Sequence, residues 1–281
     1  MERTHSFETL SGHVVICNCN EKVKTIIEEL QNSTVQASLD IVLIVQDPHL
    51  WQENPKWHPV ISGTARFLVI YGRPTDEHVL QKAQISSARA AIILADPKHG
   101  KLADAPSSLN AIAIERANPQ VHTVMELLSS MNRSHIEHSE INEIICLGEI
   151  SEKLIASSCI TPGVTNIFEN LLTTEDGTPQ IFIDPIPQRA RQLSFRQLSK
   201  KFILNEAPFI LIGYIRNIRN ETRIVINPKA NGLLNKDTPL PGRSKLITMG
   251  YRKPDFLPYL AMSRSESKEY SNIEGFYMQS F

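Results

Sequence analysis

The first half of the chain alternates short apolar runs with stretches whose apolar residues recur every three or four positions. Residues 13–17 (HVVIC) are mostly apolar and β-branched, and residues 21–31 then place Val23, Ile27 and Leu30 along one helical face. The same alternation repeats down the chain. It predicts strands at residues 13–17, 40–45, 66–72, 90–95, 121–127 and 143–148, and helices at 21–31, 75–84 (with Thr75 as its cap) and 105–117.

Most of the predicted strands are apolar on both faces, as strands are in a parallel sheet that helices cover on both sides. The pattern therefore predicts an α/β fold, a Rossmann-like doubly wound parallel sheet, over residues 1–142. The connection at residues 46–65 is long for such a sheet and holds both tryptophans, Trp51 and Trp57. We expect it to fold onto the surface with these two side chains as anchors; a contact with another subunit is the alternative.

A second helical stripe, at residues 149–172, is interrupted by Pro162 and Gly163. Proline removes one backbone hydrogen bond and glycine loosens the next turn, so two helices are expected to meet at a kink. We therefore predict a short strand and a kinked pair of helices that connects two lobes over residues 143–173. Residues 173–179 (TTEDGTP) are typical of a linker.

Beyond the linker the apolar pattern changes to a period of two, which indicates short strands. The predicted elements are strands at residues 180–186, 209–215, 223–228 and 245–251 and one helix at 195–203. This succession predicts a small α+β lobe over residues 180–256. Residues 257–281 are polar and rich in serine, and we expect them to form a tail.

The charge balance and the hydropathy of the chain bear on whether it binds nucleic acid or crosses a membrane. Lys and Arg number 29 against 30 Asp and Glu, so no basic excess suggests a nucleic-acid partner. Apolar runs stay well short of the roughly 18–20 residues that a membrane helix needs, and the first residues lack the apolar core of a signal peptide. We expect a protein without a transmembrane segment, located in the cytosol.

The four cysteines, at positions 17, 19, 146 and 159, are too few for a disulfide framework, as expected in a reducing compartment. Cys17 and Cys19 form a CxC pair at the end of the first predicted strand, where a metal ion could bind. Because the sequence holds no CxxC pair or histidine cluster to complete such a site, we do not expect zinc.

The loop after the first predicted strand reads Asn18-Cys19-Asn20-Glu21 and contains no glycine. A dinucleotide fold needs glycine here for the tight turn and for close approach of the backbone to the pyrophosphate. Asparagine tolerates a left-handed backbone, so Asn18 or Asn20 can keep the turn, but Glu21 repels a pyrophosphate. The acidic group expected to hold a ribose is also displaced, to Asp47. We therefore expect no redox use of a nicotinamide.

Several ordered segments resemble a known family, the RCK domain that regulates potassium conductance. They are GHVVIC (12–17), YGRPTDEHVLQKA (71–83), ARAAIILAD (88–96), ADA (103–105), NPQVHTVMEL (118–127), residues 145–172 and RIVINPKANGLLNKDT (223–238). The segment 145–172 is particularly similar to the crossover region of large-conductance calcium-activated potassium channels and their prokaryotic relatives. The resemblance extends over nearly the full length of the chain.

The resemblance implies how the protein assembles and where it acts. RCK domains pair through their crossover helices, and eight of them form a ring beneath a tetrameric pore. The expected partners are therefore further copies of this chain, as a dimer that assembles to an octameric ring, and the pore domain of a potassium channel. The expected location is the cytoplasmic face of the cell membrane.

Some RCK-like domains bind nucleotides, and the resemblance keeps an adenine nucleotide among the expected ligands. Its candidate binding residues are Asn18, Asn20 and Asp47 at the ends of the first two predicted strands, with Gly72 and Arg73 after the third.

Calcium or another divalent cation is the other expected ligand class. Calcium takes six to eight oxygen ligands, several of them charged. The candidates at the expected strand ends are Asp47, Asp96, Asp104 and Glu126, of which Glu126 matches a glutamate that some calcium-gated members use. The calcium-binding carboxylates of other family members correspond to Leu94, to Leu128 and to a position near Ile215 in this chain. No known set of calcium ligands is therefore complete here. For Asp104, a helix cap is the stronger expectation.

The resulting hypothesis is a regulatory gating-ring domain of a prokaryotic potassium channel, which couples ligand binding to pore opening by movement between its lobes. A peripheral regulatory subunit of a potassium transporter is the alternative within regulation. An NAD(P)-dependent oxidoreductase is the alternative from another class of protein. The histidines, however, are scattered along the chain, and none stands at a catalytic spacing from a nucleophile or an orienting partner. We therefore expect no enzymatic activity.

Overall fold

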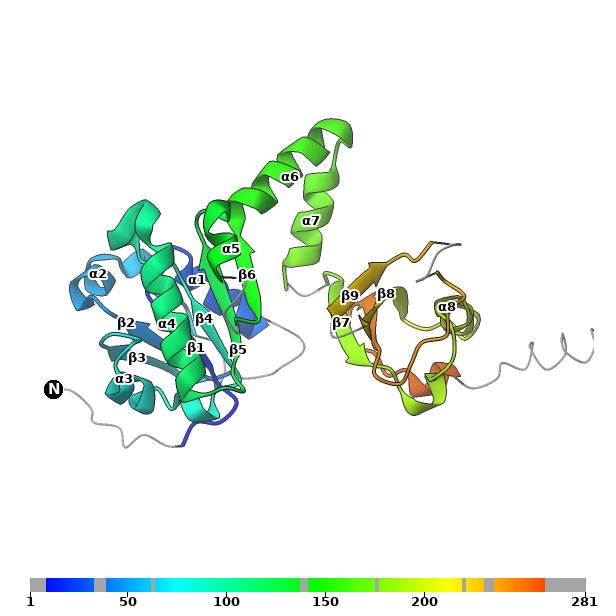
Figure 1. Cartoon of the computed structure of the whole chain (residues 1–281), viewed down its shortest axis with the longest axis horizontal. Coiled ribbons are helices and arrows are strands. Elements are labelled where there is room, and N and C mark those ends of the chain that lie inside the picture. Colours follow the sequence, from blue (N-terminus) through cyan, green and yellow to red (C-terminus); the bar gives the residue numbers. More distant parts are fainter. Residues whose placement is uncertain are drawn as a thin grey trace, which may run out of the picture. The chain divides into compact units, whose positions relative to one another are not determined.

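The computed structural model describes residues 9–32, 39–61, 64–136, 141–174, 177–218, 221–229 and 235–260. The chain divides into two compact units, Met1–Phe168 and Glu169–Phe281 (Figure 1). Each unit has its own hydrophobic core, and each is described separately below.

The first unit is built on a six-stranded parallel sheet. Its strands are β1 (Val14–Cys17), β2 (Ile41–Val45), β3 (Phe67–Tyr71), β4 (Ala90–Ile93), β5 (His122–Leu127) and β6 (Glu143–Cys146). They lie in the order β3-β2-β1-β4-β5-β6. Val14 of β1 is in register with Ile41 on one side and Ala90 on the other. The strand order therefore reverses between β1 and β4, and ligands of open α/β sheets bind at the carboxyl ends beside such a point.

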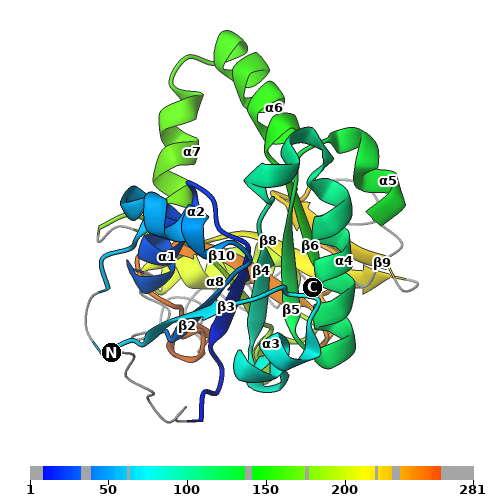
Figure 2. The ribbon, with the colours of Figure 1, turned by 90° about the vertical axis from the view of Figure 1, so that its left-hand side faces the viewer.

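Helices cover both faces of this sheet (Figure 2). They are α1 (Val23–Asn32), α2 (Pro48–Glu53), α3 (Glu77–Lys82), α4 (Asp104–Ala117) and α5 (Arg133–Ile136), with short 3₁₀ helices η1 (Pro55–Trp57), η2 (Ile85–Ser87), η3 (Pro97–Leu102) and η4 (Ser130–Asn132). Successive residues of a strand pack in two different hydrophobic cores. Ile16 belongs to the core with Ile27 of α1 and Trp51 of α2, whereas Val15 belongs to the core with Ile114 of α4. The predicted Rossmann-like sheet is confirmed.

Two local predictions in this unit have different outcomes. Trp51 is buried against the sheet, and Trp57 packs partly buried beside it, so the connection at 46–65 is anchored by tryptophan as expected. The predicted cap Thr75 is wrong: α3 begins at Glu77, and Asp76 Oδ1 accepts a hydrogen bond of 2.9 Å from His78 N. Aspartate is favoured over threonine as an N-cap, and it stands one position closer to the helix.

The crossover consists of α6 (Leu147–Ile160) and α7 (Val164–Leu172), which run antiparallel in Figures 1 and 2. Pro162 and Gly163 form the turn between them, and Gly163 has φ of 90°, a conformation that glycine adopts without strain. The hydroxyls of Ser158 and Thr165 lie 2.7 Å apart and tie the two helices together. Over residues 147–172, all of which are described, no side chain is buried.

The second unit is a four-stranded antiparallel sheet with one long helix. Its elements are β7 (Gln180–Pro185), η5 (Gln188–Ala190), α8 (Phe195–Leu204), β8 (Phe209–Ile218), β9 (Glu221–Ile226), β10 (Lys245–Gly250) and η6 (Leu257–Leu260). The strand order is β7-β10-β8-β9. Leu198 and Phe202 of α8 pack in one core with Tyr214 and Leu246 of the sheet. The predicted α+β lobe is confirmed.

The predicted polar tail differs at its start. Residues 257–260 form η6, and Tyr259 and Leu260 pack against the core of the second unit. Residues 261–281 lie outside the described residues.

Candidate functional site

The carboxyl ends of β1, β2, β4 and β5 gather most of the predicted site residues. Asn18, Asp47 and Asp96 line one small pocket, together with Gln46 and Lys98. Its volume is about 10 Å³, which is room for roughly one water molecule. Nothing as large as an adenine ring fits this pocket as it stands.

The two asparagines after β1 close the space in which a phosphate would sit. Asn18 has φ of 70°, so it is the residue that keeps the glycine-free turn. Its Nδ2 donates to Leu94 O at 2.8 Å, and its Oδ1 accepts from Gln46 Nε2 at 2.7 Å. Asn20 Nδ2 donates to Ala95 O at 3.1 Å. These amides bond to the protein itself, and a phosphate would have to displace those bonds.

Glu126 on β5 is buried, and its carboxylate is already neutralised. Lys22, in the turn before α1, forms an ion pair with Oε1. The backbone N–H of Ala95 donates to Oε2 at 3.0 Å, and Asn20 Nδ2 lies 3.5 Å from the same oxygen. The predicted role of Glu126 as a cation ligand therefore requires the ammonium group of Lys22 to leave.

Asp47 pairs with a second ammonium group, which also feels the charge of Asp96. Lys98 Nζ lies 2.5 Å from Asp47 Oδ2. The hydrogen bond from Lys98 lowers the pKa of Asp47, and the same bond raises the pKa of Lys98, to which the charge of Asp96 adds. Asp96 Oδ2 also lies 3.2 Å from His99 Nδ1. The side chain of Lys98 is 56% exposed, so it can move away into solvent.

Both of these aspartates also begin helices. Asp47 Oδ1 accepts from His49 N at 3.0 Å at the start of α2, and Asp96 Oδ1 accepts from Lys98 N at 2.9 Å at the start of η3. One oxygen of each carboxylate is thus used for capping, and the other faces Lys98 in the case of Asp47 and His99 in the case of Asp96.

Asp104 has a structural role away from this pocket. It is the first residue of α4 and does not cap that helix, contrary to the stronger expectation for it. Its buried carboxylate accepts hydrogen bonds from Leu128 N (2.8 Å), Ser129 N (3.1 Å) and Asn132 Nδ2 (2.8 Å). It therefore fixes the chain that follows β5.

Across the described ranges, no three His, Cys, Asp or Glu side chains stand together as a metal site. The four predicted carboxylates are therefore not gathered into one site for a divalent cation. Cys17 and Cys19 are buried, and burial raises the pKa of each thiol to about 12, so both stay protonated.

Gly72 and Arg73 follow β3. A Cβ on Gly72 would lie 2.4 Å from Val79 Cγ2, so glycine here allows α3 to pack closely on the strand. Arg73 is exposed. Packing therefore accounts for Gly72, and Arg73 is an exposed member of the predicted nucleotide set.

Sequence reasoning missed the two lysines that pair with carboxylates at the strand ends. Lys98 stands two residues after Asp96, and Lys22 stands two residues after Asn20. Lys98 follows a strand-end carboxylate closely in the sequence, and this position could have predicted an ion pair at the strand ends. The partner of Lys22 lies 104 residues away, and only the fold brings the two together.

Comparison with known proteins gives consistent matches. Residues 9–125 match the family described as the calcium-activated potassium channel slowpoke-like RCK domain. The calcium-gated potassium channel TvoK of Thermoplasma volcanium is 27% identical over 172 residues, which cover 59% of this chain and 46% of the channel. The human SLO3 gating ring matches with a TM-score of 0.59 at 16% identity, over 85% of this chain and 44% of that chain.

The chain thus spans less than half the length of these two proteins. None of the helices in the described ranges combines the length and apolarity that crossing a bilayer requires.

Proposed function

We propose that this chain senses a ligand and transmits its binding to a potassium-channel pore at the cytoplasmic face of the membrane. The match of residues 9–125 to the slowpoke-like RCK domain supports this proposal. The matched relative is a calcium-gated potassium channel. The chain acts as an oligomer, because movement between lobes can open a pore only when several copies are linked to it.

The observation that carries the proposal is the exposed crossover hairpin. On α6, Ile155 and Ile160 are 72% and 83% exposed, and on α7 Leu172 is 76% exposed. Burying one such side chain stabilises a folded assembly by about 1.5–3 kcal/mol. A second copy of the same hairpin covers these side chains in a dimer with twofold symmetry.

Dimers of this kind assemble further into a ring of eight copies beneath a tetrameric pore. A ligand that binds one arrangement of the lobes more tightly shifts the ring towards that arrangement. Coupling between two sites is typically about 1–3 kcal/mol. Eight weakly coupled sites therefore suffice to move a pore from closed to open, which one site could not do.

The proposed ligand is a divalent cation at Asp47 and Asp96. Asp47 already holds the ammonium group of Lys98, and Asp96 adds a second negative charge, so a cation that displaces this exposed side chain meets the same two charges. Calcium needs six to eight oxygens, so backbone carbonyls and water complete its shell. An adenine nucleotide at Asn18, Asn20, Gly72 and Arg73 is the second candidate, but it must also break the amide bonds of both asparagines.

Oligomerisation is tested by light scattering after size-exclusion chromatography of the 281-residue chain. The native chain and a control variant, Val60→Glu at another exposed apolar position (73% exposed), are expected to elute as dimers or larger species. The variant I155E/I160E is expected to elute as a folded monomer. A native chain that stays monomeric at high concentration, or a double variant that changes nothing, contradicts the proposal.

Ligand sensing is tested by thermal melts with calcium, magnesium, sodium, ADP, ATP and NAD. A ligand of the native state raises the melting temperature in proportion to the logarithm of its concentration over its Kd. We expect a divalent cation to do so in the native chain and in Glu53→Gln, a nearby exposed control, but not in D47N/D96N. Lys98→Met should strengthen the response several-fold, since it removes the competing ammonium group. A response that survives D47N/D96N places the ligand elsewhere.

A further inference from the structure

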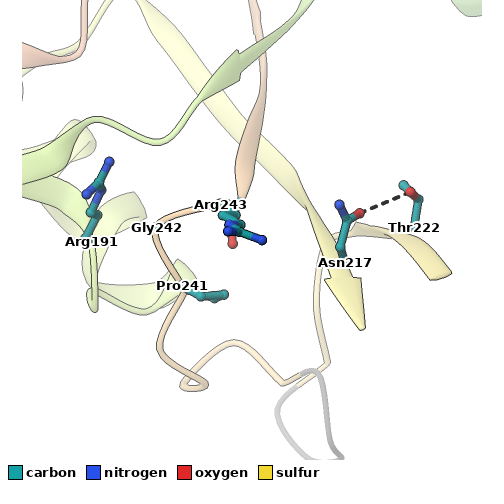
Figure 3. A pocket seen from close by; sticks show the side chains of 7 residues that line it. Arg191, Asn217, Thr222, Pro241, Gly242 and Arg243 are labelled. Carbon is teal, nitrogen blue, oxygen red and sulfur yellow. Dashed lines mark hydrogen bonds between the residues drawn. The ribbon is translucent and has the colours of Figure 1, made fainter. Parts of the chain in front are cut away.

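An open pocket of about 830 Å³ lies in the second unit. It is formed where the paired ends of β8 and β9 approach the turn before β10 and the residue that follows η5 (Figure 3). Its lining includes Arg191, Asn217, Thr222, Gly242, Arg243 and Ser244. The volume is within the range of pockets that hold small ligands, about 300–1,000 Å³.

The charge of this pocket is positive. Arg191 and Arg243 come from two different segments, and among the side chains that the structure describes in the lining there is no carboxylate. Two of the acidic residues in this unit have other partners: Asp184 pairs with Lys253 at 3.5 Å, and Asp237 pairs with Arg196. The two guanidinium groups therefore present hydrogen-bond donors to an open space.

Asn217 adds a neutral donor of fixed orientation. It is paired with Thr222 across β8 and β9, and Thr222 Oγ1 donates to Asn217 Oδ1 at 3.0 Å. This bond uses the amide oxygen, and Figure 3 shows the amide nitrogen pointing away from Thr222. The nitrogen is thus the part of Asn217 that is available to a ligand, and it needs an acceptor.

Gly242 determines where Arg191 lies. A Cβ on Gly242 would be 2.9 Å from both Cδ and Nε of Arg191. Because glycine has no side chain, the arginine can lie across the turn, in contact with its backbone. Its exposed guanidinium group therefore stands beside the turn that lines the pocket.

Ser244 forms part of the pocket wall and is 1% exposed. Its backbone is fixed at both ends, since its N–H donates to Pro241 O at 2.9 Å and its carbonyl accepts from Ile186 N at 3.0 Å. Its hydroxyl is buried and has no hydrogen-bond partner in the described part of the chain. A buried hydroxyl without a partner is destabilising, and this one lies beneath the surface of the pocket.

We propose that this pocket binds a phosphate-bearing anion with two or more negative charges. Guanidinium groups match phosphate oxygens in bidentate geometry, and the Asn217 amide supplies a further donor. The same chemistry is offered by a soluble phosphate compound and by a lipid headgroup. This site is separate from Asp47 and Asp96, and its existence does not depend on the regulatory role proposed above.

The test is isothermal titration of the 281-residue chain with inorganic pyrophosphate, against sodium chloride of equal ionic strength. The native chain is expected to bind. Arg191→Gln and Arg243→Gln are each expected to bind about ten- to a hundredfold more weakly, as loss of a charge-assisted hydrogen bond implies. Arg189→Gln, an exposed arginine outside the pocket, is the matched control and should bind as the native chain does.

Two further variants separate binding from folding. Gly242→Ala pushes Arg191 out of place without removing any charge, and it should also weaken pyrophosphate binding. Ser244→Ala should melt no lower than the native chain in the absence of anion, because it removes an unpaired hydroxyl, and it should bind pyrophosphate as the native chain does.

The source of the phosphate is assigned by a parallel experiment with vesicles. The native chain is mixed with phosphatidylcholine vesicles, with and without phosphatidic acid, and the vesicles are floated. Flotation of the chain only with the vesicles that contain phosphatidic acid supports a lipid headgroup as the ligand, if R191Q/R243Q abolishes the binding. Pyrophosphate binding without vesicle binding supports a soluble phosphate compound. Absence of both, or binding that R191Q/R243Q leaves unchanged, overturns the proposal.

Discussion

His13 links the stability of the first unit to pH through one buried side chain. It is fully buried before β1, its Nε2 lies 2.8 Å from Ala83 O, and its Nδ1 has no partner in the described part of the chain. Burial lowers the pKa of His13, against smaller opposing effects of the Ala83 carbonyl and of Asp40. The folded chain therefore keeps this imidazole neutral at pH values at which the unfolded chain is protonated.

The sign of the effect follows from proton binding. Below about pH 6.5, the ordinary value for histidine, the unfolded state binds more protons, so the free energy of unfolding falls as pH is lowered. We expect His13→Gln, whose amide can still donate to Ala83 O, to show a shallower fall between pH 7 and 5.5 in urea denaturation. Parallel curves for native and variant would contradict this.

Two controls define the pH window. Exposed His78 gives the matched variant His78→Gln, which should leave the slope unchanged. Asp40 has its pKa lowered, chiefly by the hydrogen bond from Arg66. Its contribution to stability is complete above the ordinary aspartate value of about 3.9 and is lost only below it, so it does not affect the range tested.

Asp104 is expected to stabilise the fold rather than to bind a cation. In Asp104→Asn only one oxygen remains to accept the three hydrogen bonds from Leu128, Ser129 and Asn132. Leaving a buried donor without a partner costs about 1–3 kcal/mol. Urea denaturation should show this loss, while the calcium-induced rise in melting temperature stays unchanged. Normal stability combined with a lost calcium response would restore Asp104 as a ligand.

At this scale the sequence predicted backbone conformation better than side-chain partners. The left-handed turn at Asn18 was predictable because few residue types tolerate it. The ion pair between Lys22 and Glu126 was not, because it joins residues far apart in the chain that only the parallel sheet brings together. A list of strand-end carboxylates therefore overstates how many are free for a ligand.

Helix α8 begins with a complete capping box, and this lets its N-terminus be tested by itself. Ser194 Oγ accepts from Gln197 N, and the Gln197 side chain accepts from Ser194 N at 2.8 Å. Ser194→Ala should lower the free energy of unfolding by about 1 kcal/mol, as measured by denaturation that is followed by circular dichroism.

Ser199 provides the control within the same helix. Its hydroxyl is buried without a hydrogen-bond partner in the described residues, and alanine is the better helix former. Ser199→Ala should therefore be neutral or stabilising. An equal loss in both serine variants would mean that the capping box contributes nothing specific.

Apolar periodicity predicted where the strands and helices lie, but it did not predict all of their ends. Strand β8 extends to Ile218, three residues beyond the predicted end, because Arg216 and Asn217 pair with Arg223 and Thr222 of β9. Backbone pairing of polar residues leaves no apolar signal in the sequence. It is also the extension that places Asn217 and Thr222 at the anion pocket, which is why periodicity gave no hint of that site.

At the scale of the whole molecule, the chain consists of two units with separate cores. The sequence indicated two lobes from the change in period, from helices and parallel strands to short antiparallel strands. It could not indicate the pocket of the second unit, since Arg191 and Arg243 are far apart in sequence and only the turn before β10 brings them to one opening.

The two units should respond separately to their two proposed ligands, and tryptophan makes this measurable. Both tryptophans, Trp51 and Trp57, are in the first unit, so tryptophan fluorescence reports the unfolding of that unit, whereas circular dichroism reports both. A divalent cation bound by Asp47 and Asp96 should raise the midpoint of the fluorescence transition. Pyrophosphate should instead raise a transition seen by circular dichroism and leave the fluorescence midpoint unchanged, because a ligand stabilises the cooperative unit that binds it. If each ligand moved both signals together, the units would unfold as one, and the coupling that a gating ring needs would already be present within a single chain.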